Sequence, residues 1–242
     1  MTESQSAQAG EAEEARGGKS AFREYAEAIL IALLLALFVR SFVVQAFKIP
    51  SGSMEESLLI GDHILVSKFL YWVREPKRGD IIVFRYPRDE SRDFIKRVVG
   101  LPGETVMVRG RSIYVNCPAP EEPSRCAPLR EPYAVFKPDG EAEGPERNWG
   151  PRMVPPGHLL VLGDNRNNSQ DGRFWGFLRM GEQLGRMRLR LGDFNLDLPF
   201  PCSLWPGACW DDKIRGVAFI IYWSWNGERG TVRWNRLGKT ID

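Results

Sequence analysis

Three serines stand close together in "FKIPSGSMEESLLIGD", the stretch from Phe47 to Asp62. A serine hydroxyl becomes a nucleophile when a neighbouring base takes its proton, and in a Ser–His–Asp triad that base is a histidine within hydrogen-bond reach. The chain has only two histidines, His63 inside an apolar run and His158 after the turn "PPG", and we interpret both as structural residues. The GxSxG pattern of a nucleophile elbow is absent here.

A lysine can serve as the base instead of histidine. Its ordinary pKa is about 10.4, so it must be desolvated to be neutral near pH 7, and we expect it in an apolar strand. Lys96 in "FIKRVVG" fits, and Lys68 in "VSKFLY" is ambiguous. Alternation along a strand puts Lys96 and Arg97 on opposite faces, and arginine stays charged, so Lys96 is the better candidate. On composition alone, a surface lysine in a half-exposed strand is the simpler interpretation.

A second polar stretch, "LGDNRNNSQDGRFWG", lies between apolar flanks. Its Asn, Asp and Gly residues favour tight turns. Asp164 and Asp171 could pair with Arg166 or Arg173 and hold such a loop rigid, and the alternative is a solvated turn.

These polar stretches follow the most hydrophobic part of the chain. Residues 1–24 are predicted to be a disordered cytoplasmic tail, because they are mostly small and polar. Residues 28–39 carry no polar side chain, which is too short a run to cross a bilayer, but residues 25–47 suffice if Arg40 reaches the surface. A cleaved signal peptide and a buried soluble helix are the alternatives. We predict an uncleaved transmembrane anchor over residues 25–47.

The rest of the chain, residues 48–242, has the pattern of a mainly β body. Short Val-, Ile- and aromatic-rich runs are bounded by Gly, Pro and Asp, and "TVMVRGRSIYVN" is typical of a hairpin. One weak helical period occurs near "LRMGEQLGRM". Stretches near 112–149 and 185–212 are interpreted as insertions. The predicted fold class is therefore mainly β: an antiparallel β-sheet body with one N-terminal transmembrane helix.

The four cysteines form two local pairs, Cys117 with Cys126 and Cys202 with Cys209. Neither pair is a CxxC and no histidine lies nearby, so we predict no metal site. Two disulfides in an oxidising compartment, or four unrelated buried thiols, both fit. Disulfides would place the body outside the cytoplasm. The net charge of +2 gives no pull toward nucleic acid, so we predict no nucleic-acid partner.

An anchor followed in order by "IPSGSM", "FIKRVVGLPGE" and "LGDNRNNSQDGRFWG" resembles the bacterial type I signal peptidases, Ser–Lys proteases that remove signal peptides from exported preproteins. The resemblance covers most of residues 20–242. It implies that Ser53 is the nucleophile and Lys96 the general base. It also implies that Ser51 and the Ser53 backbone N–H form the oxyanion hole, that Ser169 orients the lysine amine, and that no cofactor is needed.

The same resemblance implies the surroundings of the site. Asp171 and Arg173 match a structural ion pair, and Asp164, Asn165 and Arg166 match supporting residues. The first cysteine pair matches a disulfide of some members. Apolar positions that match the pockets for small residues at −1 and −3 of the substrate are Phe47, Ile49, Ile64, Val83 and Ile95. The implied location is the bacterial inner (plasma) membrane, with a single pass through the lipid bilayer and the catalytic body on the periplasmic or extracytoplasmic side.

The sequence departs from the family pattern at two places. The stretch "SMEESL" has Glu56 where the family usually has Pro, and Glu55 and Glu56 add negative charge that would favour a protonated lysine. Gly172 stands where Ser is commoner. These departures keep an alternative open, a catalytically weak or dead anchored β module that binds a partner.

Overall fold

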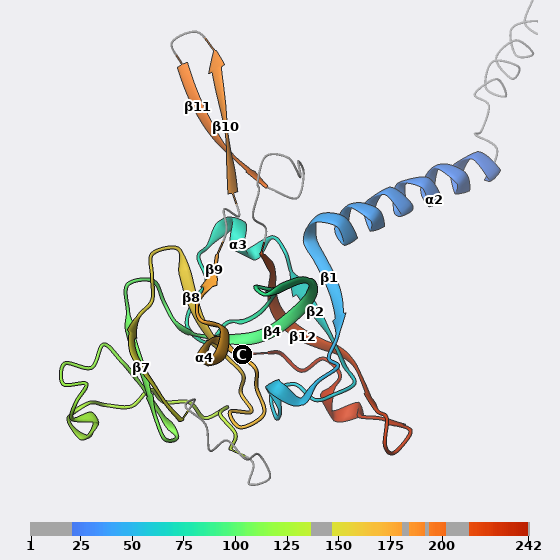
Figure 1. The fold of residues 1–242 in the computed structure, drawn as a ribbon. Coiled ribbons are helices and arrows are strands. Elements are labelled where there is room, and N and C mark those ends of the chain that lie inside the picture. The colour runs from blue at the N-terminus through green and yellow to red at the C-terminus, as the bar shows by residue number, and fades with distance from the viewer. Residues whose placement is uncertain (1–20, 137–146, 181–183, 192–193, 202–212, 242) are drawn as a thin grey trace, which may run out of the picture. The chain divides into compact units, whose positions relative to one another are not determined.

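The computed structural model describes residues 21–136, 147–180, 184–191, 194–201 and 213–241 (Figure 1). The chain divides into two compact units, Met1–Ser41 and Phe42–Asp242. The predicted pairing of Cys202 with Cys209 lies outside the described residues.

The first unit contains helix α2 (Ala21–Phe38), whose apolar side chains from Ile29 onward are exposed. Arg23, Glu24 and Glu27 lie in its first turns, where Arg23 pairs with Glu27. Judged by length, hydropathy and charge, no helix in the described ranges qualifies as a membrane span.

The segment predicted as an anchor, residues 25–47, is helical as far as Val43, but its last four residues belong to a strand. The α-helix ends at Phe38, the π-helical turn η1 (Val39–Val43) follows, and Val44–Lys48 is strand β1. Strand β1 pairs antiparallel with β2, from Val44 opposite Ser67 to Lys48 opposite His63. Backbone pairing in the sheet decides this conformation, and apolar runs alone do not distinguish a helix from a buried strand.

The second unit is built on an antiparallel sheet with the order β1-β2-β12-β3-β4-β8-β9, to which β13 adds by pairing with β12. This confirms the predicted mainly antiparallel β body. Its further strands are β2 (Asp62–Ser67), β3 (Ile81–Tyr86), β4 (Asp89–Gly100), β8 (His158–Leu162), β9 (Leu178–Arg179), β12 (Ile214–Asn226) and β13 (Thr231–Val232). Short helices interrupt it: η2 (Gly52–Met54), α3 (Leu70–Val73), α4 (Gly172–Trp175) and η5 (Trp234–Arg236).

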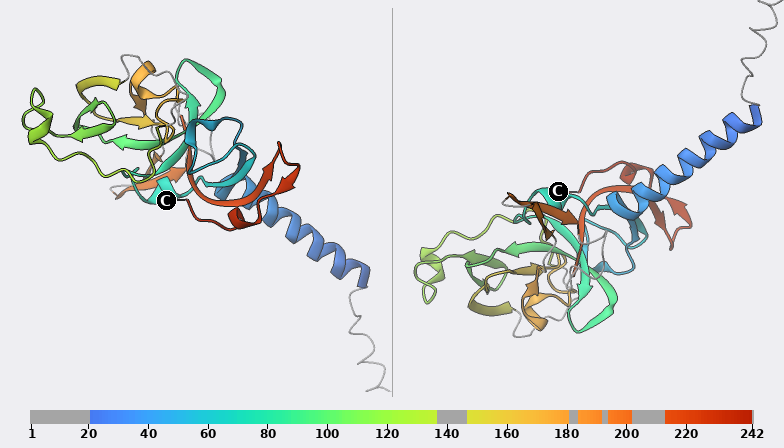
Figure 2. Two further views of the ribbon diagram at one scale, coloured as in Figure 1. Left: turned by 90° about the horizontal axis from the view of Figure 1, so that it is seen from below. Right: turned by 90° about the horizontal axis from the view of Figure 1, so that it is seen from above.

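A second sheet, in the order β6-β5-β7, contains the hairpin predicted from "TVMVRGRSIYVN". Its strands are β5 (Thr105–Arg109), β6 (Ser112–Val115) and β7 (Asn148–Met153), so both ends of the stretch near 112–149 are strands. Between them lie a Cys117–Cys126 disulfide and the turn η3 (Pro123–Arg125). Both views in Figure 2 place this sheet at one end of the body and the β12–β13 turn at the other.

A third, two-stranded sheet pairs β10 (Leu184–Leu191) with β11 (Phe194–Pro201). Its first strand begins within the stretch "LRMGEQLGRM", where β9 also ends, so the weak helical prediction there is wrong. In "LGRMRLRL" arginines alternate with apolar residues, a two-residue period that is typical of a strand.

Three clusters of buried side chains hold the body together, and each of them includes residues of β4. The first packs β1, β2, β3 and β4 around Met54 and Leu58, which are fully buried. The third joins the β6-β5-β7 sheet to β4 and β8 through Val99, Leu160 and Leu162. The residues after β1, at the middle of β4 and after β8 are therefore positioned by a common core.

Candidate active site

The turn that follows β1 holds Ser53 in a fixed place. Ser53 lies in the 3-10 helix η2 and is 8% exposed, and the neighbouring Met54 is buried in the first core cluster. Asn165 braces this turn twice. Its side-chain amide donates to the carbonyl of Gly52 over 3.1 Å, and its backbone N–H donates to the carbonyl of Ser53 over 3.1 Å.

Strand β4 brings Lys96 to the serine. The Lys96 side chain is 4% exposed, and its Nζ donates to Ser53 Oγ over 2.7 Å and to the carbonyl of Ile95 over 2.9 Å. Burial lowers the pKa of Lys96 to about 8, although the charges of Asp171 and Asp164 act to raise it. A lysine of that pKa is partly neutral near neutral pH, and a neutral amine at this distance can take the serine proton.

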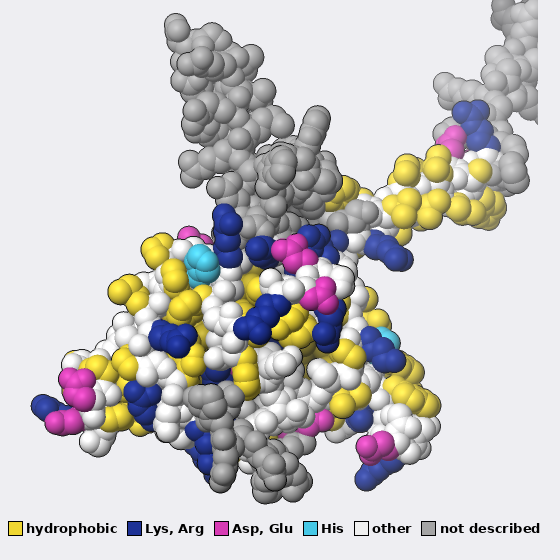
Figure 3. Space-filling model, viewed as in Figure 1, with side chains coloured by type: hydrophobic (Ala, Val, Ile, Leu, Met, Phe, Trp, Pro, Cys, Tyr) yellow, Lys and Arg dark blue, Asp and Glu magenta, His cyan; other side chains and the backbone are white. Residues whose placement is uncertain are grey.

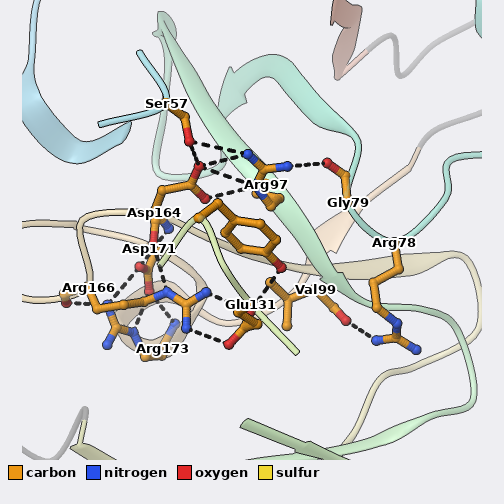
Figure 4. Close-up of polar contacts among 12 residues, drawn as sticks. Ser57, Arg78, Gly79, Arg97, Val99, Glu131, Asp164, Arg166, Asp171 and Arg173 are labelled. Carbon is orange, nitrogen blue, oxygen red and sulfur yellow. Dashed lines mark hydrogen bonds and ion pairs between the residues drawn. The ribbon is translucent and has the colours of Figure 1, made fainter. Parts of the chain in front are cut away.

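The opposite face of β4 carries a charged network (Figure 4). Arg97 is 2% exposed, and its guanidinium binds both carboxylate oxygens of Asp164 over 2.8–3.2 Å. The Ser57 hydroxyl donates to Asp164 over 2.6 Å, and the Tyr133 ring lies 3.9 Å from the Arg97 guanidinium carbon. This pair ties β4 to the residues after β8, just behind the serine and the lysine.

A second pair braces the residues after β8. Asp171 is fully buried and binds Arg173 over 2.8 Å, and it also accepts from the backbone N–H of Gly163 over 3.0 Å. Arg166 binds Glu131 over 2.7 Å and the Gly163 carbonyl over 3.0 Å. Asp171 with Arg173 forms the ion pair that the sequence predicted, whereas Arg166 pairs with a residue of the stretch near 112–149.

Two further serines predicted for the site lie beside it. Ser51 is exposed and lines the same cleft as Ser53 and Lys96. Ser169 is 8% exposed, and its hydroxyl has no hydrogen-bond partner among the described residues. Gly163 packs against Ser169: a Cβ on Gly163 would lie 2.5 Å from the Ser169 Cβ and 2.5 Å from the Ser53 carbonyl oxygen.

The five apolar residues predicted for substrate pockets come together in the first core cluster. Four of them are buried and one, Phe47, packs against the cluster partly exposed. Of the five, Ile95 lines the cleft. The buried members are Ile49, Ile64, Val83 and Ile95.

The two glutamates after Met54 differ in position. Glu56 is exposed, and Glu55 is partly buried with its carboxylate against Gly52. The carboxylates that act on the pKa of Lys96 are those of Asp171 and Asp164. The two histidines have other contacts: the His158 ring nitrogen lies 2.9 Å from the Pro156 carbonyl, and His63 packs on Tyr222.

Residues 22–191 match the family described as signal peptidase, peptidase S26. The chain belongs to this family of signal peptidases. A signal peptidase I of Leptolyngbya laminosa is 40% identical over 184 residues, 73% of this chain and 82% of that protein. A signal peptidase I of Pseudomonas aeruginosa is 34% identical over 233 residues, which cover 84% of this chain and 72% of that protein. A crystal structure of a signal peptidase I from Enterococcus faecalis V583 covers 44% of this chain and 92% of its own, with 32% identity and a TM-score of 0.34.

Membership makes this signal peptidase a serine endopeptidase, in a family that is membrane-associated in bacteria. Three residues of the site's support were missed by reasoning from the sequence: Ser57, Arg97 and Glu131. For Arg97 a signal existed, since a charged residue beside Lys96 in an apolar strand must either be exposed or find a buried partner. For Glu131, in a Pro- and Glu-rich stretch, no such signal existed.

Proposed function

We propose that this signal peptidase cleaves signal peptides from exported preproteins, with Ser53 as the nucleophile and Lys96 as the general base. The observation that carries the proposal is the 2.7 Å contact between Lys96 Nζ and Ser53 Oγ at a buried site where the pKa of the lysine falls to about 8. The same geometry argues against a partner-binding module without activity, because burying a lysine costs free energy that a binding role alone does not require.

In the proposed reaction, neutral Lys96 accepts the Ser53 proton while Oγ attacks the carbonyl carbon of the scissile peptide bond. The tetrahedral intermediate collapses, the peptide C–N bond breaks, and the protonated lysine gives its proton to the leaving amine. The signal peptide remains as an ester on Ser53. Lys96 then takes a proton from water, whose oxygen attacks the ester carbon. The bond from this carbon to Ser53 Oγ breaks, Lys96 returns its proton to Oγ, and the signal peptide leaves as a carboxylic acid.

We assign the oxyanion hole to the Ser53 backbone N–H and the Ser51 hydroxyl, and the orientation of the lysine amine to Ser169. Donors of this kind contribute about 3–4 kcal/mol to a transition state. The exposed position of Ser51 in the cleft supports its role. The Ser169 hydroxyl is buried and has no hydrogen-bond partner among the described residues. It is therefore available to bind the Lys96 amine as that amine changes position during the reaction, which supports its proposed role.

For the substrate we propose preproteins with small residues at −1 and −3. The support is that Phe47, Ile49, Ile64, Val83 and Ile95 pack in one core cluster, and that Ile95 of this cluster lines the cleft. Close-packed aliphatic side chains leave room for Ala and exclude larger groups.

Cleavage of a preprotein with an Ala-x-Ala site by the purified full chain in detergent tests the function. We expect Ser53→Ala and Lys96→Ala to lower kcat by at least about a thousandfold, because each removes a group that forms or breaks bonds. Ser91→Ala and Lys77→Ala are matched controls, since both residues are exposed and outside the cleft. Wild-type protein that cleaves no faster than Ser53→Ala would rule the proposal out.

We also propose that the enzyme works at the bacterial plasma membrane, with its body on the extracytoplasmic side and its N-terminal segment in contact with the lipid bilayer. The exposed apolar side chains of α2 support lipid contact, and the Cys117–Cys126 disulfide supports an oxidising compartment. Contact of the body with the membrane–water interface is supported by three exposed tryptophans, Trp223, Trp225 and Trp234. Protease added outside spheroplasts should digest the body, and a body protected until the cells are lysed would contradict this orientation.

A further inference from the structure

The cleft that holds Ser53 and Lys96 extends beyond them along β4 to a cationic residue, Arg92. The cleft has a volume of about 470 Å³. One wall is the turn after β1, residues 50–53, the other is residues 92–96 of β4, and Asn168 and Gln170 complete it. On the face drawn in Figure 3, basic and acidic side chains gather around apolar ones over the part where β4 lies. A substrate seated in this cleft therefore meets more than the catalytic pair.

The β4 wall can guide an extended chain. Strand β4 pairs with β3 from Asp93 to Arg97 and again at Asp89, but its pairing with β8 begins only at Arg97, opposite Leu162. Within the described residues, the edge of β4 from Arg92 to Lys96 has no strand on that side. An extended peptide commonly binds along such an edge.

Arg92 lies on the same side of β4 as the catalytic lysine. Residues two apart in a strand share a face, so Arg92, Phe94 and Lys96 do so. The contacts agree: the Arg92 guanidinium carbon lies 5.5 Å from the centre of the Phe94 ring, and Lys96 Nζ lies 5.3 Å from it. Four residues of strand span about 13 Å. Arg92 is therefore as far from Lys96 along the strand as the fourth residue of an extended substrate is from the scissile bond.

The charge of Arg92 is available to a ligand. Its guanidinium forms no hydrogen bond or ion pair with the described part of the chain, and the residue is exposed. The nearby carboxylates are engaged elsewhere: Asp93 binds Arg215 over 3.3 Å, and Asp89 accepts from the Ser91 hydroxyl over 2.6 Å. The Arg92 charge does act on Asp89 through space.

We propose that Arg92 determines specificity by favouring preproteins with Asp or Glu at the fourth or fifth residue before the scissile bond. Ile95, the pocket residue that lines the cleft, lies between Arg92 and Lys96, so the substrate's −1 to −3 residues run from Lys96 toward Arg92. This inference rests on the proposed function. Partly exposed ion pairs typically change binding by about two- to fivefold, which is the effect expected on kcat/KM.

The test uses preprotein-derived substrates that keep Ala at −1 and −3 and carry Gln, Glu or Lys singly at each other position from −6 to +4. It compares kcat/KM for wild type, Arg92→Gln and Arg92→Glu at low salt. Wild type should favour Glu over Gln at −4 or −5, Arg92→Gln should lose this preference, and Arg92→Glu should favour Lys there. Arg229→Gln, an exposed arginine at the β12–β13 turn, is the matched control and should behave as wild type.

The outcomes separate this inference from the proposed function. Cleavage of the Gln substrates by wild type, with no preference for Glu over Gln at any position, would overturn the role of Arg92 and leave the peptidase activity intact. A preference for Glu at positions +1 to +4 would overturn the placement of Arg92 against residues −4 and −5 of the substrate. Failure of wild type to cleave any substrate would count against the proposed function, and with it against this inference.

Discussion

At the scale of single residues, the environment of Lys96 explains how a lysine can act as a base. The residue is 4% exposed, and its amine lies beside the apolar Phe94 and Ile95, so burial disfavours the charged form. Two buried carboxylates, Asp171 and Asp164, oppose this effect, but each is itself neutralised by an arginine. The ion pairs behind the site therefore hold the structure together without returning the lysine to its ordinary pKa.

The pH dependence of cleavage follows from this balance. Only the unprotonated amine can take the Ser53 proton, so kcat/KM should rise with pH through a midpoint near the Lys96 pKa of about 8. Asp171→Asn removes a charge that raises this pKa and should move the midpoint to lower pH. Glu55→Gln is the control and should leave it in place. Profiles of kcat/KM between about pH 6 and pH 10 measure this, and a wild-type midpoint near 10 would mean a solvated lysine.

At the scale of elements, most strands of the body were predictable from the sequence, and the tertiary pairings were not. The β5–β6 hairpin follows from alternation and turn residues in "TVMVRGRSIYVN". Composition alone favoured a surface position for Lys96, and the motif order of the family resemblance singled it out. Alternation predicts that Arg97 faces away from Lys96. It does not predict that Arg97 forms an ion pair with Asp164, which lies 67 residues later in the chain. The end of α2 at Phe38 escaped prediction because pairing of β1 with β2 depends on residues remote in sequence.

The close approach of the β8 turn to the nucleophile turn makes Gly163 a sensitive position. A Cβ there would lie 2.5 Å from the Ser53 carbonyl oxygen and would press on Ser169. Gly163→Ala should therefore displace Ser53 from Lys96 and lower kcat/KM by about a hundredfold, the effect of a misplacement of about 1 Å. Gly227→Ala, where a Cβ meets nothing within 4 Å, is the matched control. Equal activities of the two variants would show that the turns can separate without loss.

At the scale of the whole molecule, the C-terminal segment of the body supports the turn after β1 that holds Ser53 and Ser57. Asp62, fully buried at the start of β2, binds Arg236 over 2.5 Å and accepts from Ser224 over 2.6 Å. Arg236 also donates to the Ser57 carbonyl over 2.9 Å. Since Ser57 binds Asp164 as well, two buried ion pairs from distant parts of the chain meet at one residue of this turn.

Arg236→Gln should weaken both the fold and the site. It removes the nearer cation of the buried Asp62 carboxylate and leaves only Arg233, 4.0 Å away. Loss of one partner of a buried pair typically costs about 3–5 kcal/mol in the free energy of unfolding. We expect that loss in urea unfolding, together with a lower kcat at temperatures where the variant remains folded. Arg229→Gln, exposed and nearby in sequence, should change neither quantity.

A double-mutant cycle with Asp62→Asn distinguishes a true pair from two separate supports. If Asp62 and Arg236 act together, the double variant should be clearly more stable than the sum of the single losses predicts, because the second change removes a charge that the first has left unpaired. Strictly additive losses would mean that each residue stabilises the turn through its other contacts, the Ser224 hydroxyl for Asp62 and the Ser57 carbonyl for Arg236. The coupling energy therefore measures how far the C-terminal segment and the nucleophile turn form one structure.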